Sequence, residues 1–274
     1  MANDTSKVKL PHKVVTSIIN KAKDTSTIAA LSPSTPQTFS DTTYIVFNPT
    51  TEAEVVAEGA KKSGSEVSTT PIVAKRVKVV TTTRVSDELR WADEDNQLEI
   101  VTNIIADQTA AIGRALDYVV YHAVSPKTGT ALDGYTALTA GANAVTASAS
   151  AVDDIDALAD ALIDYDINGF ALSRKFAADL RKLRIPATGQ RLYPEIPLSL
   201  NVGNIDPKVA GIMGDFSTIK WGMVRDMTSE IIEYGDPDNT GQDLKGYNQV
   251  AYRTEAVLAY AVLDPKAFAI LKTA

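Results

Sequence analysis

The chain has 274 residues, of which 45% are hydrophobic and 22% are charged, as in an ordinary soluble globular protein. It contains no cysteine and only two histidines, so disulfides, thiolate metal sites and three-histidine zinc sites are excluded. The formal net charge of −7 argues against a general nucleic-acid binder, which needs a basic face, but not against a wall that encloses DNA without gripping it.

The first 37 residues are predicted to form an N-terminal arm. Pro11 can open a helix, and apolar residues then recur at helical spacing up to about residue 23, namely Val14, Val15, Ile18 and Ile19. The prolines within 32–37 end any regular structure. A short amphipathic helix followed by an extended segment has little core of its own. We therefore expect the arm to lie across another part of the molecule or across a neighbour.

Residues 38–85 are predicted to form an extended β-hairpin loop. β-branched and aromatic residues indicate a strand at 42–47 and a returning Val/Thr strand at 71–84, with polar, flexible residues between them. Both arms hold few large apolar residues, so the hairpin is expected to be exposed. Because an exposed hairpin with bare edges is a liability for a monomer, this pattern favours burial against a neighbouring subunit.

A long helix is predicted from about residue 93 to residue 123. Ser86 is suited to an N-cap, and Asp87 and Glu88 would follow in a first turn. Apolar residues then mark one side of the helical pattern as far as Val120. At ~1.5 Å per residue the helix would be about 45 Å long, enough to form the spine of a thin, plate-like molecule.

The rest of the chain mixes helices and strands, so the predicted fold class is α+β. Helices are expected at 152–163 and, capped by Ser173, at 174–184, with a short buried strand at 169–172. The late strands are expected to return and pack on the long helix, which makes one domain discontinuous with a second domain inserted. These late strands are predicted at 210–213, 218–224, 228–234 and 247–263.

No catalytic, metal-binding or membrane motif stands out in the sequence. The glycines at 211 and 214 lack the lysine and serine of a phosphate loop. The acidic residues Asp236, Asp238 and Asp243 are interpreted as ordinary turn residues. No apolar run approaches the ~20 residues that span a bilayer, and the N-terminus has no apolar signal core. We therefore expect no cofactor, no metal, no enzymatic activity and no membrane association.

Several motifs, loose individually but specific together, resemble those of the major capsid proteins of tailed bacteriophages. They are Glu58-Gly-Ala-Lys-Lys62 at a loop tip, Val85-Ser-Asp-Glu-Leu89 before the long helix, Gly214-Asp-Phe216, and the stretch from Asn248 to Phe268. The resemblance covers residues 11–272. It implies the Hong Kong-type capsid fold, with an arm (1–37), an extended loop (38–85), a peripheral domain with the spine helix (86–131 and 228–274) and an axial domain (132–227).

The resemblance also implies a function: self-assembly as hexamers and pentamers into the icosahedral head around the double-stranded DNA of a tailed phage. The implied partners are other copies of the chain, a portal, and a separate scaffolding protein unless none is needed; the packaged DNA would be held without sequence-specific binding. The protein would be made in the host bacterial cytoplasm and end in the virion. An encapsulin-like compartment around enzyme cargo is the alternative, against which the extended arm speaks. An enzyme with an unseen site is disfavoured by the absence of any catalytic constellation.

The residues expected at subunit interfaces are Glu58, Lys61, Lys62, Glu66, Arg76, Arg84, Arg253 and Glu255. Some members of the family join a loop lysine to an asparagine of another subunit, with a glutamate as base, and Lys61 or Lys62, Asn248 and Glu255 match those positions. Arg253 lies two residues from Glu255 on the same strand face, and an ion pair between them would keep the carboxylate charged and poorly basic. Simple salt bridging of the loop lysines is therefore favoured over cross-linking.

Overall fold

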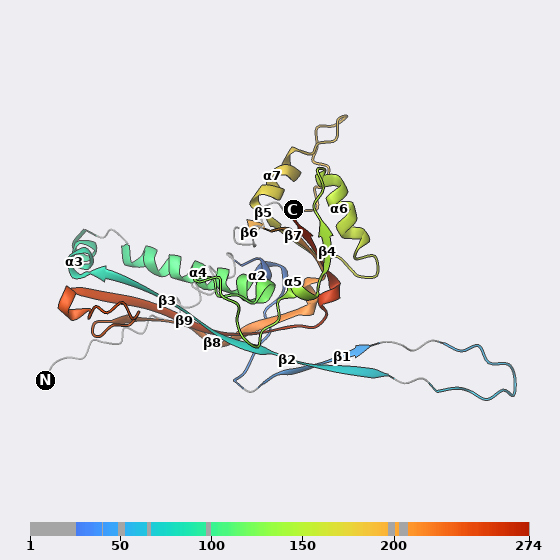
Figure 1. Ribbon diagram of the computed structural model, residues 1–274, viewed down its shortest axis with the longest axis horizontal. Coiled ribbons are helices and arrows are strands. Elements are labelled where there is room, and N and C mark those ends of the chain that lie inside the picture. Colours follow the sequence, from blue (N-terminus) through green and yellow to red (C-terminus); the bar gives the residue numbers. More distant parts are fainter. Residues whose placement is uncertain are drawn as a thin grey trace.

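The computed structural model describes residues 26–39, 41–48, 53–64, 67–96, 100–196, 201–202 and 208–273. Figure 1 shows an elongated platform, a second body that stands on one part of it, and a thin hairpin that projects beyond its end. Mixed helices and sheets confirm the predicted α+β fold class. The helix expected within residues 11–23 lies outside the described residues.

The helices are α2 (Thr27–Leu31), α3 (Asp87–Asn96), α4 (Ile100–His122), α5 (Leu138–Gly141), α6 (Ala151–Asp160) and α7 (Arg174–Lys182), with short 3-10 turns η1 (Phe216–Thr218), η2 (Lys245–Tyr247) and η3 (Pro265–Ala267). The strands are β1 (Thr43–Asn48), β2 (Ser68–Val73), β3 (Lys75–Ser86), β4 (Asn143–Thr146), β5 (Gly169–Ser173), β6 (Asn201–Val202), β7 (Val209–Gly214), β8 (Ile219–Ile232), β9 (Gln249–Val262) and β10 (Phe268–Lys272).

The platform is an antiparallel sheet in the order β3-β9-β8, with α4 along one face (Figure 1). Ile112 of α4 packs with Met227 of β8 and Ala256 of β9. The buried Gln108 of α4 donates to the carbonyl of Tyr252 at 2.8 Å and accepts from the hydroxyl of Thr254 at 2.7 Å. These contacts confirm that the late strands return to pack on the long helix.

The long helical region begins earlier than the apolar pattern suggested. α3 begins at Asp87, as the capping signals indicated, and the Ser86 hydroxyl accepts from the backbone N–H of Leu89 at 3.3 Å. The 23 residues of α4 extend about 34 Å at ~1.5 Å per residue. Residues 97–99, between α3 and α4, lie outside the described part of the chain.

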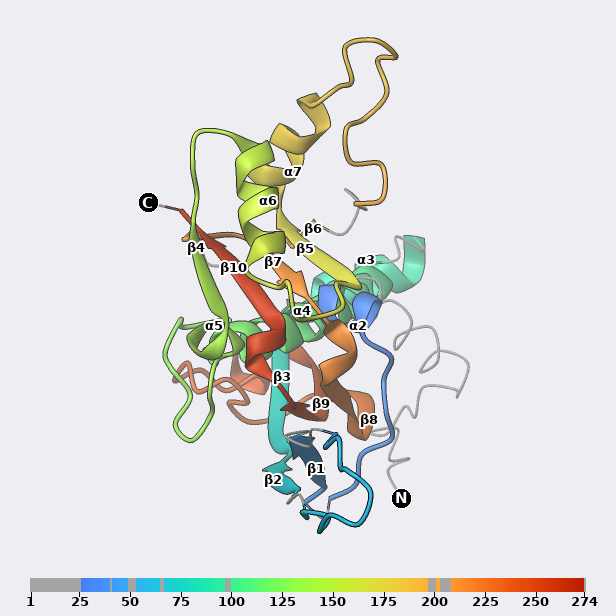
Figure 2. The same cartoon turned by 90° about the vertical axis from the view of Figure 1, so that its right-hand side faces the viewer.

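A five-stranded sheet in the order β4-β10-β7-β5-β6 forms the second body, and Figure 2 shows α6 and α7 on one side of it. The central strands β7 and β10 are buried on both faces. Phe268 and Ile270 of β10 point into the core shared with α4, whereas Ala269 and Leu271 face the cluster formed by α6 and α7. The strand β10 was not predicted, because a short run that is almost entirely apolar has no strand periodicity.

Residues 26–37 lie across α4 and β8 of their own subunit, which is one of the two positions expected for the arm, and residues 26–29 are buried there. Ile28 is fully buried, and the chain then runs beside β8. The Thr35 N–H donates to the carbonyl of Trp221 at 2.8 Å, and the Trp221 ring N–H donates to the carbonyl of Ser32 at 3.0 Å. Gly222 permits this approach, since a Cβ there would lie 1.9 Å from the Thr35 carbonyl oxygen.

The hairpin is shorter than expected. β1 and β2 pair in an antiparallel register from Thr43 opposite Val73 to Asn48 opposite Ser68, but the rest of the predicted returning strand, β3, pairs with β9 in the platform. The buried Ala74 separates the two parts. The expected limit of the loop at residue 85 is therefore too late, since β3 belongs to the platform. The sheets differ from the expected domain limits at two other places. Strand β8 crosses the expected boundary at residue 227 within the platform sheet, and β10 belongs to the second sheet rather than to the platform.

Candidate subunit interface

One face of the β1–β2 hairpin is apolar and exposed. Ile45 lies opposite Pro71 and Phe47 opposite Thr69, and the same face continues to Val73. Ile45 is 62% exposed and Phe47 is 66% exposed, far more than such side chains normally are in a finished core. An isolated two-stranded hairpin is marginally stable in water, so this face is suited to burial against another surface.

The tip of the loop is organised by its own hydrogen bonds. Glu54 accepts from the backbone N–H of Ser63 at 3.1 Å and from its hydroxyl at 2.5 Å, which ties the two limbs together and lowers the pKa of Glu54. Ala60 N–H donates to the carbonyl of Ala57 at 3.1 Å, and Gly59 has the positive φ of +80° that the third residue of a type II turn requires. Glu58 is therefore held at the apex of a turn.

The interface residues predicted at the tip are exposed where the structure describes them. Glu58, Lys61 and Lys62 all lie on the surface of the tip. Glu66 lies outside the described residues. Their engagement with a neighbouring subunit, including salt bridging of the lysines, stays a prediction.

Arg76 fixes the place where the loop leaves the platform. Its guanidinium pairs with Asp41 at 2.9 Å and donates to the carbonyl of Phe39, so one cation joins the two strands at the base of the hairpin. The hydroxyl of Tyr135 donates to the carbonyl of Arg76. These contacts tie the base of the hairpin to the platform within the subunit.

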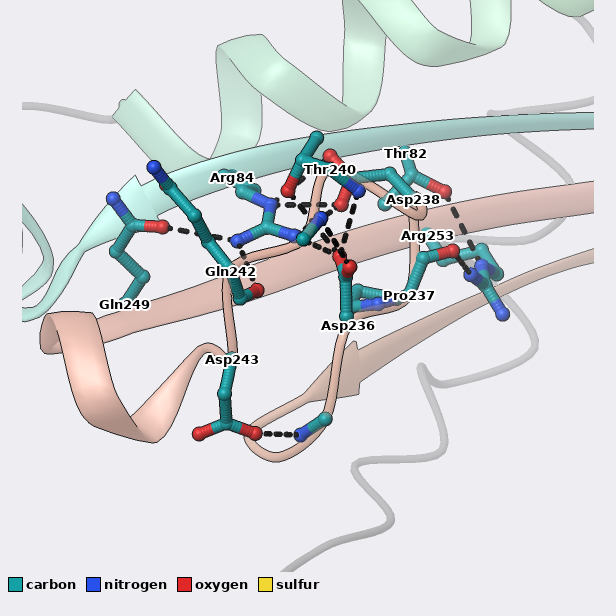
Figure 3. A network of polar contacts seen from close by, with 12 residues as sticks. Thr82, Arg84, Asp236, Pro237, Asp238, Thr240, Gln242, Asp243, Gln249 and Arg253 are labelled. Atoms are coloured by element: carbon teal, nitrogen blue, oxygen red, sulfur yellow. Dashed lines mark hydrogen bonds and ion pairs between the residues drawn. The ribbon is translucent and has the colours of Figure 1, made fainter.

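Arg84 joins the edge strand β3 to the loop between β8 and β9 (Figure 3). Its side chain is 15% exposed; it pairs with Asp236 at 2.5 Å and, through Nε, donates to Asp238 at 2.8 Å. A third donation reaches the carbonyl of Gln242 at 3.0 Å. Arg84 is therefore occupied within its own subunit, and a direct contact with a neighbour stays a prediction.

The acidic residues around Arg84 also shape the loop, as their interpretation as turn residues predicted. Asp236 accepts from the backbone N–H groups of Thr240 at 3.0 Å and Gly241 at 2.6 Å. Asp243 accepts from Gly235 N–H at 3.0 Å. Among the described residues, no group of three or more His, Asp or Glu side chains could hold a metal ion.

Both carboxylates that pair with Arg84 have lowered pKa values. Burial raises the pKa of Asp236, but the N–H donors of Thr240 and Gly241 and the Arg84 charge outweigh it. The hydrogen bond from Arg84 is the main cause of the lowered pKa of Asp238. Since a lowered pKa in the folded state stabilises the fold above the unfolded value of ~3.9, this contribution is lost as the pH falls through the folded pKa values.

Replacing Arg84 with methionine, which keeps most of the apolar stem, is expected to lower the melting temperature at pH 7. The difference from wild type should begin to shrink below about pH 4 and fade as the pH passes through the lowered folded pKa values, because the two carboxylates then become protonated in wild type as well. Thermal unfolding of both proteins from pH 7 to pH 3 measures this. Lys182→Met, which removes an exposed cation with a single i,i+3 partner, is the control and should change little. A difference that stays constant with pH would contradict the proposed contribution of these pairs.

Glu255 has different ionic partners from those expected. Its carboxylate pairs with Lys78 of β3 at 2.7 Å and lies 3.7 Å from Arg225 of β8, whereas the closest acidic partner of Arg253 is Glu230 at 3.9 Å. The expected Arg253–Glu255 ion pair is therefore wrong, since cross-strand neighbours reach the carboxylate first. The hydrogen bond from Lys78 lowers the pKa of Glu255, and Arg225 and Arg253 add to this through their charges.

The residues of the cross-linking set do not come together within one subunit. Asn248 and Glu255 are seven residues apart on an extended segment, which separates them by more than about 20 Å at ~3.4 Å per residue. The lowered pKa also makes Glu255 a weak base for removing a proton from lysine. Figure 1 shows the loop tip and the start of β9 at opposite ends of the molecule. Any such reaction would have to bring residues of different subunits together.

The carboxylate of Asp117, which holds the N-terminal segment in place, was not among the predicted site residues. Asp117 of α4 is buried and receives four hydrogen bonds, from the hydroxyls of Ser26 (2.5 Å) and Thr27 (3.0 Å) and from the N–H groups of Thr27 (2.9 Å) and Ile28 (3.2 Å). Burial raises the pKa of Asp117, and the four donors oppose this. The sequence did contain a signal for this contact, because Asp117 is a charged residue on the apolar side of a long helix. A carboxylate buried in such a position requires polar partners.

Comparison of the sequence with known protein families identifies the class to which this fold and its exposed hairpin belong. The sequence profile of the phage capsid family matches residues 7–273, almost the entire chain. The chain belongs to the phage capsid family. This makes it a major capsid protein, a structural component of the virion, and confirms the resemblance found in the sequence.

Solved structures similar to this capsid protein come from several phages. A chain from Mycobacterium phage Ogopogo is 32% identical, with 90% of this chain and 91% of that chain covered and a TM-score of 0.77. A chain from Gordonia phage Cozz is 26% identical, with 91% and 86% covered and a TM-score of 0.70. The capsid of an empty GTA particle, solved with C5 symmetry, shares the fold at 18% identity, with 91% and 90% covered and a TM-score of 0.60.

The comparison with curated proteins gives no match. None of the structures just described favours the encapsulin alternative. Within the part of the capsid protein that the structure describes, no helix has the length and apolar character needed to cross a membrane.

Proposed function

We propose that the capsid protein assembles as hexamers and pentamers into an icosahedral head that encloses the double-stranded DNA of a tailed phage. The observation that carries this proposal is the apolar hairpin face of Ile45, Phe47 and Val73, which is exposed in the single subunit. A surface of this kind gains free energy when it is buried against another copy.

The division into an arm, a loop, a peripheral domain and an axial domain is part of this proposal, with limits shifted to agree with the sheets. The loop comprises residues 38–74, and the platform sheet with α4 corresponds to the peripheral domain. The five-stranded sheet with α6 and α7 corresponds to the axial domain, which would close the rings. The C5 symmetry used for the GTA capsid structure is consistent with fivefold rings for this fold.

The experiment that tests the proposal is electron microscopy and sedimentation of the capsid protein expressed alone in bacterial cytoplasm. Closed shells or tubes of hexamers are the expected result. Packaged DNA in particles from infected cells, rather than an enzyme cargo, would separate a phage head from a compartment. Shells that form only with a co-expressed phage protein would identify a scaffolding or portal partner. Subunits that stay monomeric under all these conditions would contradict the proposal.

A further inference from the structure

Positive charge is concentrated along the outer side of α7 and on the hairpin that follows it. Residues 174–191 carry six cations and one carboxylate, whereas residues 151–166, which include α6, carry six carboxylates and no cation. α7 buries Phe176, Ala177 and Leu180 in the second body, so its charged side faces outward. We call the six cations the basic strip; five are exposed and the last is half-buried, and they are Arg174, Lys175, Arg181, Lys182, Arg184 and Arg191.

The basic strip ends on a hairpin that projects from the second body. The Ile185 N–H donates to the carbonyl of Gln190 at 2.9 Å, and the Leu192 N–H donates to the carbonyl of Leu183 at 3.3 Å, which joins the two limbs. Figure 1 shows this segment, in gold, beyond the end of α7 and at the end of the second body that is farthest from the platform. The basic strip is therefore accessible in the single subunit.

The charges of the basic strip are not neutralised within the described part of the subunit. Only Lys182 has a carboxylate partner there, Asp179 at 2.8 Å. The Arg191 guanidinium donates to the carbonyls of Tyr193 at 3.0 Å and Ile196 at 2.9 Å, which position it without cancelling its charge. The other four cations occur in none of the ion pairs between described residues.

Two parts of the basic strip carry positive charge where it does not stabilise the fold. Arg174 and Lys175 lie in the first turn of α7, where the helix dipole favours carboxylates and opposes cations. Arg184 and Arg191 lie opposite each other across the hairpin, and like charges in directly opposed positions are destabilising. Because stability does not explain these charges, they indicate a negatively charged ligand from outside the subunit.

The composition of the basic strip favours phosphate groups over the surface of another protein. A protein interface has an apolar core within a polar rim, but none of the large apolar side chains exposed in the described residues lies between positions 174 and 191. Four of the six cations are arginines, whose planar guanidinium groups bind phosphate through two parallel hydrogen bonds. A row of cations along a helix is typical of surfaces that contact the backbone of a nucleic acid.

We infer that the basic strip binds the phosphate backbone of double-stranded DNA without reading its sequence. The inference rests on the proposed function for the source of this DNA, and it adds the surface of the subunit that contacts it. At ~1.5 Å per residue, the nine residues of α7 extend about 13 Å, and successive phosphates of one strand are ~3.4 Å apart. The helix therefore matches about four phosphates, and the hairpin extends the contact.

Fluorescence anisotropy of a labelled duplex of about 20 base pairs, mixed with the unassembled full-length chain between about 50 and 200 mM salt, measures this binding. The variant Arg174→Gln, Arg181→Gln, Arg184→Gln removes three exposed cations and should bind about tenfold more weakly. Each phosphate contact contributes about −0.9 to the slope of log K against log salt, so the slope should become shallower by about 2.7.

The control variant is Lys127→Gln, Lys245→Gln, Lys272→Gln. It changes the net charge by the same amount at exposed sites outside the basic strip, and it should bind DNA within about twofold of wild type. Equal weakening in the two variants, or no binding of DNA by the wild-type chain at low salt, would overturn the inference. Unchanged DNA binding with loss of assembly in the arginine variant would also overturn it, and would assign the basic strip to carboxylates of a second copy.

Acetylation of lysines provides a second test that needs no substitution. DNA should protect Lys175 and Lys182 from acetylation and leave Lys127 and Lys245 reactive, as measured by mass spectrometry of the unassembled chain. Equal reactivity of all four lysines with and without DNA would contradict binding at the strip. Both tests use single chains, so the proposed function is judged separately. A chain that binds DNA through the strip but never forms particles would overturn the proposed function and support the DNA-binding surface.

Discussion

Replacement of Asp117 with alanine is expected to lower the free energy of unfolding by about 3 kcal/mol. The substitution removes the acceptor for four donors, of which the N–H groups of Thr27 and Ile28 cannot turn away because they belong to the first turn of α2. Water cannot replace it without opening a contact in which Ile28 is fully buried. Chemical denaturation of the isolated subunit measures the loss, and hydrogen exchange over residues 26–39 shows whether this segment detaches first.

Asp107 offers a matched control, since it is an exposed aspartate on the same helix and Asp107→Ala should change stability by less than about 0.5 kcal/mol. The pH dependence is a further test. Because the pKa of Asp117 is raised in the folded state, its protonation adds stability below the unfolded value of ~3.9, and this contribution is lost as the pH rises through the folded pKa. The deficit of Asp117→Ala should therefore widen on acidification, whereas that of Arg84→Met should shrink. Equal stability of Asp117→Ala and wild type would contradict a stabilising role for the hydrogen bonds between Asp117 and residues 26–28.

The double substitution Ile45→Asp, Phe47→Asp is expected to abolish assembly while the subunit stays folded. Both side chains are mostly exposed in the single subunit, so their loss removes little of its core. Burial of one large apolar side chain contributes about 1.5–3 kcal/mol, and a buried carboxylate without a partner costs more. A loss of about 3 kcal/mol per subunit contact raises the concentration needed for assembly by roughly 150-fold.

Sedimentation across a concentration series measures this shift, and circular dichroism with thermal unfolding verifies that the subunit is intact. The control is Ile45→Leu, Phe47→Leu, which keeps the face apolar and should still assemble at close to the wild-type concentration. Assembly of the aspartate variant at an unchanged concentration would show that the hairpin face is not buried between subunits. Failure of the leucine variant as well would mean that precise packing, rather than apolar burial, controls the contact.

The two substitutions separate folding from assembly. Asp117 acts inside one subunit, where it joins the N-terminal segment to α4, and its removal should affect isolated subunits and particles alike. Ile45 and Phe47 are proposed to act where copies meet, and both are mostly exposed in the single subunit, so their replacement should leave the isolated subunit folded. An arm segment that detaches from α4 would also uncover the cavity of about 310 Å³ lined by Ser26, Ile112 and Trp221, which makes hydrogen exchange a sensitive readout.

Local sequence patterns predicted the elements whose residues alternate in character or carry clear caps. Ser173 was identified as an N-cap and accepts from the N–H of Phe176 at 3.2 Å, and Ser86 and Asp87 correctly placed the start of α3. The strand β9 followed from a long run of β-branched and apolar residues. These features depend on neighbours within a few residues, so a single sequence contains them.

The sequence by itself determined the α+β class, the hairpin, the helical spine and the motifs that mark a phage capsid protein. Only the tertiary structure decided that β3 leaves the hairpin for the platform, that β10 joins the second sheet, and that Glu255 pairs with Lys78 instead of Arg253. It also decided that Asp117 meets a segment some 90 residues earlier in the chain. Such contacts depend on which distant segments share a sheet edge or a buried pocket. Strand pairing and carboxylate partners of this kind follow from long-range packing, which periodicity and local propensity do not encode.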